Sequence, residues 1–224
     1  MGSDYYSTKL SAERLELCYE LAPPRVRQYL SAEIEHVVSA VPRGGIVSEL
    51  GCGYGRVLER LAKDASLVLG IDTSVDSLRL ARERLAALTN VAVAGMDASN
   101  PGLKEGTFDL VCCIQNGISS FHVDPRALME AAVAITKPGG KVMFSSYADE
   151  FWNHRLEWFR IQSSRGLVGE IDESATGDGT IVCRDGFNAT TVTADQFAAL
   201  ACGLGHRVSV NVIDGSSVFC EIST

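Results

Sequence analysis

The sequence predicts an α/β fold, a doubly wound sheet of seven strands that is mostly parallel. Short apolar runs alternate with helical periodicity from about residue 40 to about residue 150, as in parallel strands covered on both faces. A glycine-dense turn follows the first of these runs. The chain ends in two apolar runs joined by Asp214-Gly215, which predicts an antiparallel C-terminal hairpin.

The part of the chain before the first strand is predicted to be helical. Apolar residues recur at helical spacing over residues 11–40, and Pro23-Pro24 interrupts the pattern. We therefore expect two helices there, and we assign residues 1–40 to an N-terminal helical lid.

Five strands and three helices are predicted in the central part, residues 41–150. The expected strands are residues 45–48, 67–71, 91–94, 108–114 and 141–146, and the expected helices are residues 57–62, 74–88 and 125–136. Asp124-Pro125 gives the last helix an N-cap and a favoured first-turn proline. The run Lys137-Pro138-Gly139-Gly140 is expected to form a turn before the fifth strand.

The pattern changes after residue 150. Residues 151–162 predict an aromatic-rich helix, and glycine-containing turns at residues 176–179 and 185–186 predict a small β-hairpin. We assign residues 151–193 to a cap or insertion. The run Thr193-Ala194-Asp195-Gln196 predicts a capping box, so residues 194–224 complete the core with a helix and a hairpin of residues 206–213 and 218–222.

Composition limits the classes of partner. The 224 residues carry a net charge of −8, which argues against a nucleic-acid partner because phosphate binding needs a basic surface. The acidic balance suits a positively charged ligand. The N-terminal part of the sequence has no apolar run, so we expect neither a signal peptide nor a membrane span.

Seven cysteines are an odd number. Several lie inside apolar runs, and no pair has the spacing of a metal site. We therefore expect no metal and a reducing compartment, the cytoplasm.

The glycine-dense turn is the most informative motif. Glu49-Leu50-Gly51-Cys52-Gly53-Tyr54-Gly55 has the spacing G-x-G-x-G, whereas a dinucleotide fold uses G-x-G-x-x-G. Glu49 would repel a pyrophosphate and would attract an ammonium or a sulfonium. The turn therefore favours S-adenosylmethionine (SAM) over NAD as the ligand.

With the strand ends that follow this turn, the chain resembles the class I SAM-dependent methyltransferases that act on small molecules. The signals are residues 49–55, Asp72 after the second strand, and Met96-Asp97-Ala98 after the third. The resemblance covers about residues 40–150. It implies a Rossmann-like sheet with SAM at the carboxyl ends of the strands and S-adenosylhomocysteine (SAH) as product.

The resemblance assigns a role to each polar strand end. It implies that Asp72 binds the ribose hydroxyls and that Asp97 meets the adenine amino group. The cofactor contacts predicted in this way are Glu49, Gly51, Cys52, Gly53, Gly55, Asp72, Thr73, Asp97, Ala98 and Gln115. Taken alone, Glu49 or Asp72 could instead cap a helix or a strand.

The acceptor side is predicted from the loop after the fourth strand. Residues 111–121 are similar to the corresponding loop of glycine N-methyltransferase and related enzymes, which implies that Asn116 holds the acceptor and contributes to catalysis. Asn116 before Gly117 also suits a simple turn. The loop lacks an Asn-Pro-Pro-Tyr sequence, which disfavours methylation of a nucleic-acid amine.

Further catalytic and substrate-binding candidates come from residue type and position. His122 and His154 are candidate bases, although either also suits the surface, and Tyr147 is a third catalytic candidate. Tyr5 and Tyr6 would reach the pocket if the N-terminal segment folds over it. Trp152 and Arg155 follow the fifth strand, and Arg155 could pair with an acceptor carboxylate.

These observations lead to one expected function and two alternatives. We expect an enzyme that transfers a methyl group from SAM to N or O of a small molecule, chiefly by in-line positioning. A NAD-dependent oxidoreductase and a SAM-binding regulator without turnover are the alternatives. The expected partners are a small-molecule acceptor and a second copy of the chain, with the hairpin of the cap either covering the pocket or forming the dimer contact. No membrane or nucleic-acid partner is expected.

Overall fold

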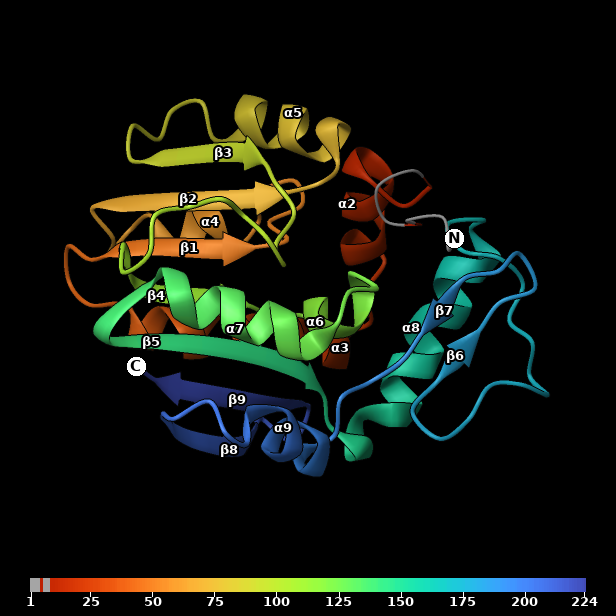
Figure 1. Ribbon diagram of the computed structural model, residues 1–224. Helices are drawn as coiled ribbons and strands as arrows, with labels where there is room; N and C mark the ends of the chain where they lie inside the picture. Colours follow the sequence, from red (N-terminus) through yellow and green to blue (C-terminus); the bar gives the residue numbers. More distant parts are fainter. Residues whose placement is uncertain (1–4, 6–8) are drawn as a thin grey trace.

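The computed structural model describes residue 5 and residues 9–224. A seven-stranded sheet with the order β3-β2-β1-β4-β5-β9-β8 forms its centre (Figure 1). Its strands are β1 Ile46–Leu50, β2 Leu67–Asp72, β3 Val91–Gly95, β4 Phe108–Cys113, β5 Thr136–Tyr147, β8 Arg207–Ile213 and β9 Ser217–Ser223. Strands β1 to β5 pair in parallel, and β9 pairs antiparallel with both β5 and β8. The predicted fold class is confirmed.

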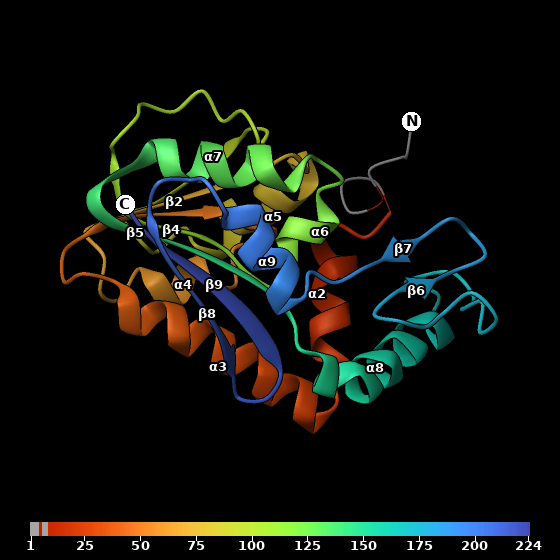
Figure 2. The same ribbon diagram turned by 60° about the horizontal axis from the view of Figure 1, so that its bottom comes forward.

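Helices cover both faces of this sheet, as Figure 2 shows for α7 and α3 on opposite sides. One face carries α7 Pro125–Ile135 and α9 Ala194–Ala201, and their buried side chains share a core with β4 and β5. The other face carries α3 Pro24–Ala40, α4 Leu58–Leu61 and α5 Val75–Arg84. The continuously apolar strands are explained by this burial on two sides.

A second layer of structure lies at the carboxyl ends of the parallel strands, toward which β1, β2 and β3 point in Figure 1. It contains α2 Ala12–Glu20, the 3-10 turn η1 Asp149–Phe151, α8 Trp152–Ser164, and the short pair β6 Ile181–Val182 and β7 Asn188–Ala189. An aromatic cluster with Tyr29, Phe151, Trp158 and Phe187 joins α2 and α3 to the cap, residues 151–193. The remaining helix, α6 Gly117–Ser120, follows β4.

Several local predictions are confirmed by the hydrogen bonds at element ends. The Asp124 side chain accepts from the backbone N–H of Arg126 and so caps α7. Thr193 and Gln196 form the reciprocal capping box of α9. Asp214 and Gly215 have φ of 56° and 61°, the left-handed pair that a tight hairpin turn needs.

The largest differences from the predicted boundaries are in β5 and α5. The expected turn at residues 137–140 belongs to β5, where the register against β4 shifts between Phe108 and Leu110. Gly139 takes a φ of 81° and its N–H donates to the carbonyl of Thr224 at 2.7 Å, so the segment is a bulge. The helix expected over residues 74–88 ends at Arg84.

All seven cysteines are unbonded, and only Cys202 is exposed. In the described part of the chain, every helix is too short or too polar to cross a bilayer.

Candidate active site

A cavity of about 300 Å³ lies at the carboxyl ends of the parallel strands. Its wall on the sheet side comes from the ends of β1 and β2, the segment after β3 and the loop after β4. Its opposite wall comes from α2, α3, Tyr147 and α8. Open α/β sheets bind their ligands at this edge, and most of the predicted cofactor contacts line the cavity.

The glycine turn forms the floor of the cavity. Gly51 and Gly53 line it, with φ of 77° and 52°, and a side chain on Gly51 would collide with the ring of Phe121. Gly55 has a φ of 90°, and a Cβ there would lie 2.6 Å from Leu85 of the turn that follows α5. The first glycine therefore admits the Phe121 ring against the turn, and the third allows close packing of Leu85 after α5.

The two predicted carboxylates after β2 and β3 both line the cavity. Asp72 accepts from the backbone N–H groups of Gly53 and Ser74, each at 2.8 Å. Asp97 accepts from the backbone and hydroxyl of Ser99 at 2.8 and 2.7 Å. Thr73 and Ala98 lie beside them in the same wall. Asp72 thus also fixes the glycine turn.

Glu49 is a buried carboxylate on the cavity wall, 4% exposed, near the end of β1. Its Oε2 has no hydrogen-bond partner. Burial raises the pKa of Glu49 to about 8, with a smaller contribution from Asp72, and Arg56 acts in the opposite direction. A buried carboxylate without a partner fits an ammonium group of a ligand.

Arg56 is a cavity residue for which the sequence analysis assigned no role. Its Nε and Nη2 are buried without a hydrogen-bond partner, and its Cζ lies 4.4 Å from the centre of the Tyr19 ring. These donors fit a carboxylate. Glu49 and Arg56 therefore present both charges that an amino-acid zwitterion requires, and the methionine part of SAM is such a zwitterion.

The loop after β4 is held in an unusual conformation. Gln115 and Asn116 have φ of 57° and 63°. The backbone N–H of Gln115 is shared by Oε2 of Glu33 at 3.0 Å and Oγ of Ser145 at 2.9 Å. Tyr19 donates its hydroxyl to Oε1 of Gln115 at 3.0 Å, and the Gln115 side chain lines the cavity.

Asn116 lies outside the cavity, where the sequence-based prediction had expected it to meet the acceptor. The side chain is buried, its Nδ2 donates to the carbonyl of Thr190 at 2.9 Å, and its Oδ1 accepts from Ser146 at 2.7 Å. The amide therefore ties the loop to the segment before α9 and stays outside the cavity wall. The alternative interpretation, a turn residue before Gly117, describes Asn116.

Arg155 also differs from its prediction. It is fully buried in the cap, and its guanidinium donates to the carbonyls of Gly179, Ala189 and Thr190 at 2.8, 2.9 and 3.3 Å. These bonds hold α8 to the chain on both sides of the small hairpin. The side chain is committed to the cap and does not border the cavity.

The other acceptor-side candidates divide between the cavity and the surface. Tyr147 lines the cavity and stacks on Phe151 with ring centres 6.2 Å apart. His122 and His154 are exposed, and Trp152 packs against the aromatic cluster; these three lie outside the cavity wall. Tyr6 lies outside the described residues.

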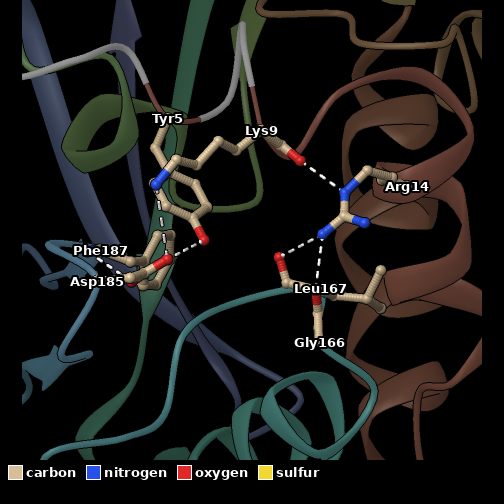
Figure 3. A network of polar contacts seen from close by, with 7 residues as sticks. All are labelled: Tyr5, Lys9, Arg14, Gly166, Leu167, Asp185 and Phe187. Atoms are coloured by element: carbon tan, nitrogen blue, oxygen red, sulfur yellow. Dashed lines mark hydrogen bonds and ion pairs between the residues drawn. The ribbon is translucent and has the colours of Figure 1, made fainter.

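Tyr5 contacts the cap and not the cavity (Figure 3). The wall residues that the sequence analysis missed come mainly from α2, its flank and α8: Leu10, Leu15, Tyr19 and Gln162, with Phe121 from the loop after β4. The sequence signal for α2 was its amphipathic spacing, which does not distinguish a core face from a cavity face.

Comparison with known proteins agrees with this geometry. Residues 47–140 match the family model described as a methyltransferase domain. The chain is 30% identical over 138 residues to a ubiquinone biosynthesis O-methyltransferase of Colwellia psychrerythraea, 57% of this chain and 54% of that protein. The chain spans about half the length of the curated relatives it matches.

Solved structures show the same fold. A SAM-dependent methyltransferase from Aquifex aeolicus aligns with a TM-score of 0.63 at 16% identity, over 92% of this chain and 96% of that one. A complex of DhpI with SAM aligns with a TM-score of 0.62 at 20% identity, over 90% and 88%. Residues 47–140 are therefore similar to a methyltransferase domain, and the sheet has the fold of solved SAM-dependent methyltransferases.

Proposed function

We propose that the chain transfers the methyl group of SAM to a small-molecule acceptor, and that the acceptor atom is a hydroxyl oxygen. The observation that carries the proposal is a cavity with two kinds of lining. Glu49 and Arg56 present buried atoms without hydrogen-bond partners beside the glycine turn, and the opposite wall is apolar and aromatic. The O-methyltransferase name of the curated relatives supports oxygen over nitrogen.

The residues of this chain bind and orient the donor. Glu49 holds the ammonium and Arg56 the carboxylate of the methionine part. Asp72 with Thr73 accepts the ribose hydroxyls, and Asp97 with Ala98 borders the adenine. Bound SAM supplies a methyl group on a sulfonium, which is already an activated leaving group. Positioning the acceptor in line with that methyl group is then the main catalytic task.

A hydroxyl acceptor must lose its proton during transfer. Tyr147 is the predicted catalytic candidate whose side chain borders the cavity, and we propose that it orients the acceptor hydroxyl. Glu33 lies behind Gln115, and burial raises its pKa to about 7. Its Oε2 accepts the backbone N–H of Gln115 and so helps to hold the loop that borders the cavity.

The alternatives from the sequence make different demands on this site. A NAD-dependent oxidoreductase would place a pyrophosphate at the turn, against the buried carboxylate of Glu49. A SAM-binding regulator without turnover would keep the donor contacts and lack a productive acceptor. We also infer a reducing compartment, the cytoplasm, from the seven unbonded thiols; a homodimer stays a prediction of the sequence.

A turnover assay tests the proposal. The purified chain is mixed with SAM and a panel of phenols, alcohols and amines, and SAH is quantified by chromatography. We expect acceptor-dependent SAH formation with a hydroxyl compound. The Glu49→Gln variant should lose most of this activity, whereas Glu59→Gln, an exposed glutamate on α4, should keep it. SAM binding without SAH formation across the panel would favour the regulator.

A further inference from the structure

Gln162 is a buried polar residue whose side chain lacks a partner. It lies on α8, is 2% exposed and lines the cavity. Its backbone carbonyl accepts from Arg165 and Leu167, whereas its side-chain amide makes no hydrogen bond to the described residues and keeps some accessible surface where it meets the cavity. Buried amides are almost always hydrogen-bonded, so the missing partner is expected inside the cavity.

The side chains around Gln162 are aromatic or apolar. Trp158 and Phe159 precede it by four and three residues on α8 and line the cavity with it. Cys18 and Tyr19 of α2 and Leu30 of α3 border the same cavity. Such a wall favours a flat, apolar ligand.

The other polar groups of this wall have protein partners. The indole N–H of Trp158 donates to the carbonyl of Cys18 at 2.8 Å. The hydroxyl proton of Tyr19 is used by Gln115. Among the wall residues on α2, α3 and α8, the Gln162 amide is therefore the side-chain group with an unused donor pair and an unused acceptor.

The charged side chains of the cavity are those proposed to hold the donor, and among them Arg56 also lies against the Tyr19 ring. The charged residues that line the cavity in the described chain are Glu49, Arg56, Asp72 and Asp97, and all four belong to the donor site. A charged acceptor would lose its hydration against Trp158 and Phe159 without gaining a counterion. This cost is large for an unpaired charge in an apolar site.

We infer that Gln162 is the specificity residue of the acceptor site. Its amide binds a hydroxyl or carbonyl of a neutral, flat acceptor that lies against Trp158 and Phe159. This inference deepens the proposed function and rests on it. It predicts selection against acceptors that carry a carboxylate, which reverses the sequence-based expectation that Arg155 would pair with one.

Ligand-observed NMR titration of the SAH-saturated chain tests the inference with three probes: catechol, benzene and 3,4-dihydroxybenzoate. Wild type should bind catechol at least tenfold more tightly than 3,4-dihydroxybenzoate. Gln162→Met, which keeps the side-chain length, should weaken catechol about tenfold and leave benzene unchanged. Glu157→Gln, an exposed change on α8, should behave as wild type.

Other results overturn the inference. These are absence of catechol binding to wild type, equal affinity for the charged probe, or an unchanged catechol affinity in both Gln162→Met and Gln162→Leu. A role in the fold is separated by thermal unfolding: removing an unpaired buried amide should keep or raise Tm, so a lowered Tm in both variants also contradicts it.

Failure of the proposed function is recognised separately. SAH affinity is measured first and should be equal in wild type and the Gln162 variants. If SAH does not bind wild type, the proposed donor fails, and the catechol comparison on the chain without SAH still decides the role of Gln162.

Discussion

The Tyr5 hydroxyl donates a hydrogen bond of 2.7 Å to Oδ2 of Asp185 and joins the N-terminal segment to the cap (Figure 3). Lys9 lies 3.8 Å from the same carboxylate, and Arg14 donates to the carbonyl of Gly166 at 2.8 Å. Because Leu15 of α2 borders the cavity, these contacts hold one of its walls in place.

Removing the Tyr5 hydroxyl should loosen this wall. Burial and the bond to Asp185 raise the pKa of Tyr5, so the phenol remains a donor at neutral pH. Tyr5→Phe should lower the free energy of unfolding by about 1 kcal/mol and speed proteolysis within residues 1–20. Urea unfolding and limited trypsin digestion measure both effects. Lys9→Gln is the control, since an exposed ion pair contributes little; an equal loss in that variant would refute the role of the hydroxyl.

Glu49→Gln should stabilise the chain without ligand. The folded-state pKa of about 8 lies above the ordinary 4.5. The contribution of Glu49 to stability is therefore full below pH 4.5 and is lost as the pH rises to 8. At pH 8 the neutral amide should raise the free energy of unfolding by about 1–3 kcal/mol, and at pH 4 the difference should vanish. A less stable variant at pH 8 would contradict the burial of an unpaired carboxylate.

SAH binding should release a proton from Glu49. The unliganded carboxyl holds its proton below about pH 8, whereas an ammonium ligand favours the ionised form. Affinity should therefore increase from pH 6 to pH 7.5. Calorimetry in two buffers of different ionisation enthalpy counts the released protons. In Glu49→Gln the release should be lost, and an undiminished release there would assign it to another group.

Asp72→Ala should weaken SAH binding about tenfold or more. The change removes charge-assisted hydrogen bonds of about 1.5–3 kcal/mol, and it also frees the N–H groups of Gly53 and Ser74 that shape the turn. Asp76→Ala is a matched control because Asp76 is an exposed aspartate on α5. Equal affinities in the two folded variants would refute the ribose assignment.

The fold was predictable because its signals are local. The apolar runs of the strands, the Asp124 N-cap and the Thr193 capping box are patterns within a few neighbouring residues. The bulge at Gly139 could not be predicted in this way, because its backbone partner is Thr224 at the far end of the chain. A turn motif looks the same in sequence whether or not a distant strand pairs with it.

The predictions for the donor side and the acceptor side differed for the same reason. Glu49 and Asp72 were found because their positions at strand ends follow from the fold. The acceptor wall depends on how α2 and α8 pack across the sheet edge, and nothing local distinguished Arg155, whose guanidinium bonds to carbonyls of the cap, from Gln162, which lines the cavity. Asn116 was selected by the resemblance of its loop to that of glycine N-methyltransferase, and Arg155 by residue type and position; the hydrogen bonds of both side chains serve the structure.

The most direct test of the account is the affinity of the wild-type chain for SAH, measured by isothermal titration calorimetry at pH 7.5. We predict one saturable site per chain and no displacement of SAH by NAD. Absence of saturable SAH binding by the folded chain, or displacement of SAH by NAD, would contradict the assignment of the Glu49–Arg56 end of the cavity to the methyl donor.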